Sequence, residues 1–300
     1  MSKSRKLAYS ALLFNAVIWG AAFPIIKPAF DLISPMQYLY LRFLVAGIIS
    51  LPIVIWYYIK EKPSLTYIFK VLLIELLGIT IPLFLLYEGL NQTSALEASL
   101  LGSIAPLFIV IGSMWFLKEK ESQREWQGLA LALIGSLILI LDPILNGYAI
   151  TGSNLKGNLL IMGYNLTYTM YAIIAKKIYK KKPPIFLGSL TYLTTALIYG
   201  VILFSKQSLP SLSLLSIPTV LLPVLYMAIP GGILAFGLHL FAVSKIEVSE
   251  ANLFTYLNGV VAIPVSALLL HEYPTFITLL AVIFITWGVI RAEAKKSTHR

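Results

Sequence analysis

The side chains of this chain that could do chemistry are mostly polar or aromatic, and they recur in pairs four positions apart. Residues at i and i+4 lie on one face of a helix, so each pair would form a stripe rather than a single group. Amide, hydroxyl and aromatic groups arranged in this way can hold an amphipathic solute by hydrogen bonding and stacking. The pairs are Asn15 and Trp19, Ser99 and Ser103, Tyr164 and Tyr168, and Asn252 and Tyr256, with Asn258 two positions after the last pair.

Ionisable side chains inside the apolar segments are a second group of candidate functional residues, and His239 among them is also a candidate substrate contact. Glu75, Glu88 and His239 could each carry a coupling proton, His239 because imidazole titrates near neutral pH. Lys27 and Arg42 lie toward the ends of apolar segments. They have a structural role or extend to the lipid headgroups, or they attract an anionic group of a solute.

Catalytic and metal-binding patterns are missing from the sequence. The chain has 13 acidic residues, mostly at loops or segment ends, three distant histidines and no cysteine. These numbers exclude thiolate chemistry and disulfides, and no cluster of metal ligands is present. There is no phosphate-binding loop of the GxxxxGK[ST] type, so no nucleotide-driven pump is indicated. We therefore predict no catalytic residues, no metal and no cofactor.

The elements that must position these residues are membrane helices. Hydrophobic residues make up 58% of the 300 residues and charged residues only 12%, about half the usual share of charge in soluble domains. Because a spanning helix needs roughly 20 apolar residues, ten spans fill most of the chain. The predicted spans are 7–28, 36–58, 68–90, 95–117, 125–142, 158–176, 186–205, 217–243, 249–270 and 275–291.

The basic residues predict the orientation of these spans. Nineteen of the 23 Lys and Arg residues fall at the two termini or in every second gap between spans, whereas the other gaps hold only Lys156 and Lys206. Positive charge gathers on the cytoplasmic side, so both termini should be cytoplasmic in a multi-pass protein of the cell membrane. The same distribution explains the net charge of +10 without a nucleic-acid partner. Membrane lipid and a small-molecule solute are the partners we expect.

Several short patterns mark the ends and breaks of these spans. Ser94 and Glu97 have the spacing of a capping box that opens a helix. Glu119 and Glu272 are expected to cap or orient the helices that follow them. Pro230 to Gly232 interrupts the eighth span, and we interpret it either as a hinge or as an ordinary kink.

An internal repeat divides the chain near residue 150. A shift of 149 places Lys27 on Lys176 and Trp19 on Tyr168, and a shift of 153 places Glu97 on Glu250 and Glu119 on Glu272. We predict two five-helix domains, residues 1–146 and 147–300, here called the first and second halves. Since five is odd, the two copies should be inverted in the membrane, and transporters with such repeats usually bind solutes near the midplane.

The repeat predicts that the four stripes meet around one central cavity. A structural role is the alternative for each, because Ser and Asn also join packed membrane helices and Tyr and Trp also anchor at interfaces. We favour the cavity for Trp19, which lies near the middle of its span, and for Asn252, Tyr256 and Asn258. For the other paired residues both interpretations stay open.

Several motifs resemble those of the EamA branch of the drug/metabolite transporter superfamily. They are WGAAFPIIK from Trp19, LYLRFLVAG from Leu39, Pro106 followed by WFLKE from Trp115, and the weaker LLLHE that ends at Glu272. The resemblance covers nearly the whole chain. It implies ten helices in two inverted five-helix repeats and the movement of small organic solutes, including amino acids, often outward. Gly259 departs from the pattern, because it stands where the first half has Pro106.

We expect a secondary transporter of small metabolites or amino acids, working by alternating access and exporting its solute. Two other functions remain open. An intramembrane lipid- or prenyl-modifying enzyme would need clustered acidic residues or a nucleophile beside a base. A passive channel or flippase for an amphipathic solute could use the same cavity, and the sequence does not separate it from a carrier.

Overall fold

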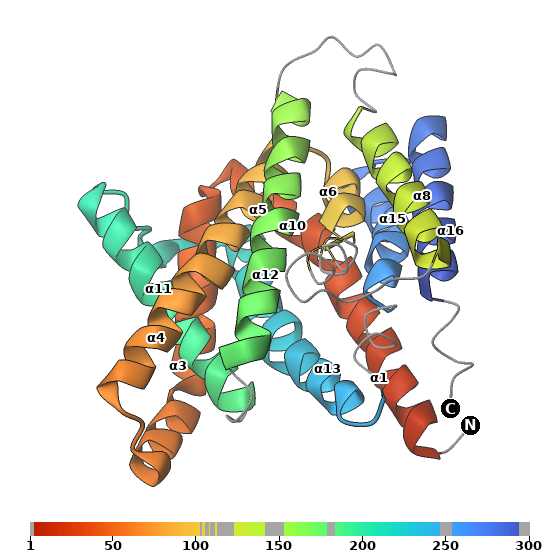
Figure 1. Ribbon diagram of the computed structural model, residues 1–300. Coiled ribbons are helices and arrows are strands. Elements are labelled where there is room, and N and C mark those ends of the chain that lie inside the picture. The colour runs from red at the N-terminus through yellow and green to blue at the C-terminus, as the bar shows by residue number, and fades with distance from the viewer. Residues whose placement is uncertain are drawn as a thin grey trace.

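The computed structural model describes residues 3–102, 104–105, 108, 112, 123–141, 153–178, 184–246 and 254–293. Over these ranges the secondary structure is helical and contains no strand. The helices pack against one another in a bundle and cross at a variety of angles (Figure 1). The predicted all-helical fold is confirmed.

The first half begins with a helix that is broken after Gly20. Its elements are α1 (Lys3–Gly20), α2 (Ala22–Ile26), the 3-10 helix η1 (Lys27–Asp31), α3 (Pro35–Glu61), α4 (Leu65–Glu75), the π-helix η2 (Leu76–Thr80), α5 (Ile81–Gln92), α6 (Ala95–Gly102) and α8 (Gln123–Ile140).

The second half contains a matching series. Its elements are α10 (Ser153–Ile178), α11 (Pro184–Ser205), the 3-10 helix η3 (Leu212–Ser216), α12 (Pro218–Ala228), the π-helix η4 (Ile229–Leu234), α13 (Ala235–Val243), the 3-10 helix η5 (Phe254–Tyr256), α15 (Leu257–Leu270) and α16 (Phe276–Glu293).

Local sequence signals explain where these helices begin and end. At the start of α3, the Ser34 hydroxyl accepts a hydrogen bond from the Gln37 backbone, and the Gln37 side chain accepts one from the Ser34 backbone. Together they satisfy two of the free N–H groups at a helix start. At the other end Lys62 adopts a left-handed conformation (φ 42°), which stops α3.

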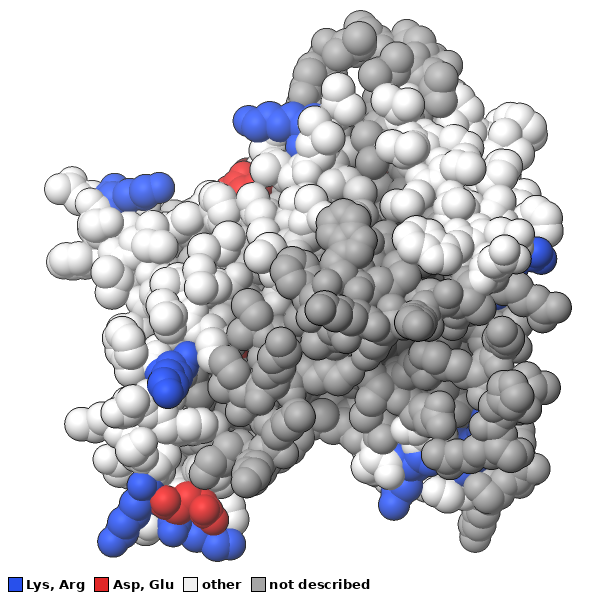
Figure 2. Space-filling model, viewed as in Figure 1, with Lys and Arg blue, Asp and Glu red and all other residues white. Residues whose placement is uncertain are grey.

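Five helical stretches are long and apolar enough to cross a bilayer: Ser4–Asp31, Pro35–Glu61, Leu65–Gln92, Gly188–Ser205 and Pro218–His239. Shorter apolar helices cover Trp126–Gly135, Leu257–Leu270 and Phe276–Gly288. Large apolar side chains point outward from several of these helices, and the described part of the face in Figure 2 is mostly uncharged, with a few separate groups of Lys and Arg. This is the surface of a polytopic membrane protein, while the count of ten spans stays a prediction.

The predicted repeat is visible in the positions of the helix breaks. Adding 153 to the bounds of α4 gives those of α12, and adding 153 to the bounds of α8 gives those of α16. The same shift places the π-helix η2 onto η4, and Gly78 onto Gly231. Two π-helices at equivalent positions are a specific sign of duplication, because π segments are rare.

The packing of the helices follows the same symmetry. Helix α8 packs along α16, α3 along α11, α5 along α10 and α1 along α13. In each pair one helix comes from the first half and the other from the second. In the first two pairs the two helices are equivalents of each other in the repeat. The last two pairs are equivalent to one another, since α5 corresponds to α13 and α1 to α10. A pseudo-twofold axis between the halves produces this pattern. The inversion of the halves and their boundary at residue 146 stay predictions.

Arg42 lies in the core instead of extending to the lipid headgroups. Its side chain is 9% exposed, its guanidinium lies over the ring of Phe43 at 4.9 Å, and it donates a hydrogen bond to the Tyr87 hydroxyl. Tyr87 in turn stacks on Tyr38, whose hydroxyl donates to the carbonyl of Pro223 at 2.8 Å. Of the two roles predicted for Arg42, a structural one in joining α3 to α5 agrees with these contacts.

Candidate functional site

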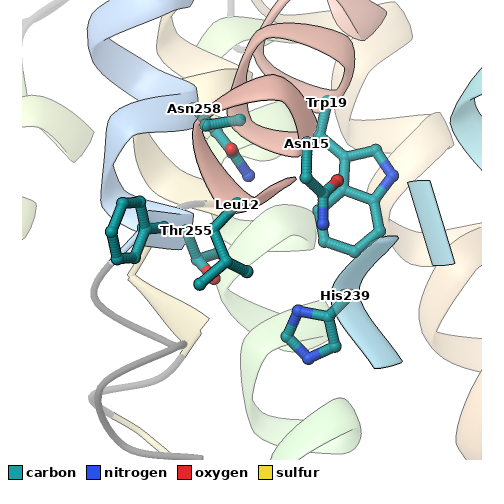
Figure 3. Close-up of a pocket in the computed structure, with 8 residues that line it drawn as sticks. Leu12, Asn15, Trp19, His239, Thr255 and Asn258 are labelled. Atoms are coloured by element: carbon teal, nitrogen blue, oxygen red, sulfur yellow. The ribbon is translucent and has the colours of Figure 1, made fainter. Parts of the chain in front are cut away.

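A small pocket lies between α1 of the first half and α13, η5 and α15 of the second half (Figure 3). The empty space there is about 180 Å³ when open solvent is included, but the enclosed room is that of about one water molecule, far less than in most small-molecule sites. The lining residues are Leu12, Asn15, Ala16, Trp19, His239, Phe254, Thr255 and Asn258. Four residues predicted as substrate contacts, Asn15, Trp19, His239 and Asn258, are therefore brought together.

Trp19 is fixed by a contact that the sequence did not indicate. Its indole N–H donates to the carbonyl of Gly231, in the π-helix η4, at 2.8 Å. Nearby, the Tyr226 hydroxyl donates to the carbonyl of Ile18 at 2.7 Å, and the Trp19 ring lies 6.0 Å from that of His239. The predicted break at Pro230 to Gly232 is thus part of a π-helix, and its Gly231 carbonyl positions the Trp19 side chain that lines the pocket.

The side-chain oxygens of two asparagines at the pocket have no hydrogen-bond donor among the described residues. Asn15 is only 2% exposed, and the side-chain oxygens of Asn15 and Asn258 are both buried and accept no hydrogen bond from any described residue. Figure 3 shows Asn15 projecting from α1 and Asn258 from α15 around the same space. A buried polar group left without a hydrogen bond costs roughly 1–3 kcal/mol, so the pocket favours a molecule that bonds to these amides.

The other predicted site residues do not line this pocket or are not described. Tyr164 and Tyr168 stack on each other along α10, with ring centroids 5.6 Å apart, and Tyr168 continues to Tyr171. The Tyr171 hydroxyl donates to the carboxylate of Glu75 at 3.2 Å. Ser99 is buried within α6. Ser103 and Asn252 lie outside the described residues, as does the side chain of Tyr256.

Sequence reasoning missed four of the pocket residues. Leu12 and Ala16 share the α1 face of Asn15 and Trp19, so helical spacing alone could have included them. Phe254 and Thr255 lie between the predicted Asn252 and Tyr256, in a 3-10 turn that shifts which side chains face inward. Within the described ranges, no three His, Asp or Glu side chains come close enough to hold a metal ion.

A second polar cluster lies farther along the first span, around Lys27 at the start of η1. Lys27 donates to the carbonyl of Thr93 and lies 3.7 Å from the carboxylate of Glu272. The same carboxylate accepts hydrogen bonds from the backbone N–H groups of Ala95 at 3.2 Å and Leu96 at 3.0 Å. Glu272 was predicted to cap or orient the helix that follows it, and its carboxylate instead caps α6 of the other half.

The buried polar residues beside this cluster are also connected to one another. The Thr93 hydroxyl lies within hydrogen-bonding reach of the Glu97 carboxylate and, at 2.7 Å, of the Asn158 side-chain oxygen. The Glu97 backbone donates to the Ser94 hydroxyl at 3.0 Å, which is one of the two bonds of the predicted capping box. Glu119, the equivalent of Glu272 in the first half, lies outside the described residues.

Comparison with known proteins agrees with this architecture. The sequence model of the EamA-like transporter family matches twice, over residues 6–141 and 155–291. The uncharacterized transporter YetK of Bacillus subtilis is 27% identical, over 98% of this chain and 89% of its own length. The uncharacterized inner membrane transporter YedA of Escherichia coli is 25% identical, over 85% of this chain and 80% of its own length.

A solved structure shows the same fold. The match has a TM-score of 0.65 and 18% sequence identity, and it covers 97% of this chain and 99% of that chain, which is described only as the crystal structure of a protein. With the family matching both halves, the chain belongs to the EamA-like transporter family and is a multi-pass membrane transporter.

Proposed function

We propose that the protein is a secondary transporter that moves small organic metabolites or amino acids by alternating access. The observation that carries this proposal is the pocket between the halves, where the buried side-chain oxygens of Asn15 and Asn258 accept no hydrogen bond within the described residues. A solute that hydrogen-bonds to Asn15 and Asn258 would remove their desolvation cost, and Trp19 and His239 supply flat surfaces for stacking.

The pocket's position suits this mechanism. It lies partway along the first span and is formed by helices from both halves, so a movement of one half against the other would change its access. Its small volume agrees with a closed state. We propose that Ser99, Ser103, Tyr164, Tyr168, Asn252 and Tyr256 join the wall of the cavity when it widens.

The direction and orientation of transport belong to the same proposal. Export is the direction that the resemblance to the family implies. Cytoplasmic termini and a location in the cell membrane follow from the distribution of Lys and Arg along the chain. Proton coupling through Glu75, Glu88 or His239 would appear as solute accumulation that depends on a pH gradient.

The test is solute uptake into proteoliposomes that contain the purified protein, using a panel of radiolabelled amino acids and small metabolites, with and without a pH gradient. A carrier shows saturable uptake and counterflow, whereas a channel shows neither. Product formation in detergent would instead indicate an enzyme. If no solute in the panel shows saturable exchange, the proposed carrier function is contradicted for these classes.

Single amide variants test the site. Asn15→Ala and Asn258→Ala should each reduce the apparent affinity for the transported solute by roughly two- to tenfold, which is the loss expected for one hydrogen bond. Asn91→Ala is the matched control, because Asn91 is an exposed amide on α5 away from the pocket. Equal kinetics in all three variants would remove both asparagines from the site.

A further inference from the structure

The polar cluster at the far end of the first span joins the two halves directly. We call it the far-end latch: Lys27, Glu272, and the first backbone N–H groups of α6 at Ala95 and Leu96. Lys27 and α6 belong to the first half, and Glu272 follows α15 in the second. One carboxylate therefore connects two elements of the opposite half, through an ion pair and two hydrogen bonds.

The latch lies beyond the pocket along the first helix. Lys27 comes eight residues after the pocket residue Trp19, about 12 Å farther from the N-terminal end at the rise of an α-helix. Between Trp19 and Lys27, the first span is in close contact with α15. A Cβ added to Gly20 would lie 2.6 Å from the Val261 Cβ and 2.7 Å from the Asn258 carbonyl oxygen, both on α15.

Buried side chains complete the closure between pocket and latch. Ala22 is 2% exposed and Ile26 is fully buried. The pocket is therefore sealed on this side by the contact between α1, α2 and α15, and the latch holds the same helices at their far end. A passage toward that face requires α15 and its following turn to separate from α2 and α6, which would break all three latch interactions.

The chemistry of the latch suits a contact that forms and breaks. The Lys27 and Glu272 side chains are 27% and 21% exposed, so the pair is less enclosed than a fully buried ion pair, whose separation would leave an uncompensated charge in the interior. The N–H groups at the start of α6 also favour an acidic partner, because the helix dipole places partial positive charge there.

We propose that the far-end latch is a gate that closes the pocket toward the face opposite the N-terminus, and that Lys27 and Glu272 are positioning residues of the transport cycle. The inference rests on the proposed function for its role in transport, but the gate itself can be tested without a known solute. The distribution of basic residues predicts that this face is the outer one.

The experiment uses the absence of native cysteine. Ala16→Cys places one thiol in the pocket, and a membrane-impermeant thiol reagent is added to right-side-out and to inside-out vesicles. In the parent, labelling through the latched face should be slow. Lys27→Gln and Glu272→Gln should each speed it about fivefold, and only from the outer side, which corresponds to a loss of about 1 kcal/mol in pairing. The double variant should add little, because both changes remove the same pair.

Two controls separate a gate from general loosening. Lys27→Arg keeps the charge and should label at close to the parent rate. Arg291→Gln removes the hydrogen bonds from Arg291 to Gln127, at 3.1 and 2.6 Å, which also join the halves but at α8 and α16. It should leave labelling unchanged. Thr255→Cys is a second reporter in the pocket, in case Ala16→Cys folds poorly.

The gate is overturned if the Gln variants label at the parent rate, if labelling rises equally from both sides, or if Arg291→Gln has the same effect. Changed labelling without uptake of any solute in the panel would support the gate and count against the proposed transport function. Saturable uptake with unchanged labelling would support the proposed transport function and count against the gate.

Discussion

The π-helix η2 provides a sharp test of how the first half is packed. Gly78 lies in this segment, and a Cβ added there would come within 1.7 Å of the Tyr171 ring, whereas ordinary contact begins at 3.4 Å. Gly78→Ala must therefore displace the ring, and with it the hydroxyl that donates to Glu75 at 3.2 Å. We expect a large loss of stability from this single methyl group.

The size of the loss can be worked from these contacts. Overpacking a tight site costs roughly 1–3 kcal/mol, and losing a hydrogen bond to a carboxyl group costs roughly 1.5–3 kcal/mol. The total of about 2.5–6 kcal/mol corresponds to a fall in melting temperature on the order of 10 °C. The assay is a thermal melt of the purified protein in detergent, followed by size-exclusion chromatography.

The matched control is Gly237→Ala on α13, where an added Cβ meets no atom within 4 Å. Alanine is the better helix former, so this variant should be as stable as the parent or slightly more so. A second control repeats Gly78→Ala in a Tyr171→Ala background, where the missing ring leaves room and the cost should fall below about 1 kcal/mol. Equal losses in both backgrounds, or from both glycines, would refute the reasoning.

Two further predictions concern the core between α3, α5 and α12, and both are measured by the same melt. Tyr38→Phe should cost about 1 kcal/mol of stability because it removes the 2.8 Å hydrogen bond to the Pro223 carbonyl. Tyr58→Phe, at an exposed tyrosine of the same helix, should have no effect. Equal melting temperatures for the two variants would contradict a stabilising role for the Tyr38 hydrogen bond. Arg42→Lys should cost about 2 kcal/mol, since Lys does not reproduce the planar contact with Phe43 and Tyr87. A loss no greater than that of Arg291→Lys, at an exposed arginine, would show that the guanidinium contacts are not needed.

The sequence was sufficient for the helical membrane fold and for the repeat, because both depend on patterns that extend over the whole chain. Apolar length predicts a span wherever the helix lies, and the shift of 153 reproduces the bounds of α4 and α12. The π-helices were not predicted. Proline and glycine mark a break at Pro230, but they do not specify how the backbone hydrogen bonds are arranged there.

The site was only partly predictable, because spacing along a helix identifies a face and not what that face meets. Asn15 and Trp19 face the pocket, whereas Tyr164 and Tyr168, their equivalents in the repeat, stack on each other outside its lining. Glu272 shows the same limit. Its sequence neighbours suggested a local cap, but its partner Ala95 lies 177 residues earlier.

That long separation has a consequence for biogenesis. Ribosomes make Ala95 and Leu96 well before Glu272, so the amino end of α6 cannot receive its carboxylate while the earlier spans leave the translocon. Until then, the backbone N–H groups of Ala95 and Leu96 in the nascent chain lack this acceptor. The amino end of α6 is therefore capped only at the last stage of synthesis. By then the turn before α16 has been translated and can pack against α6, which was made much earlier.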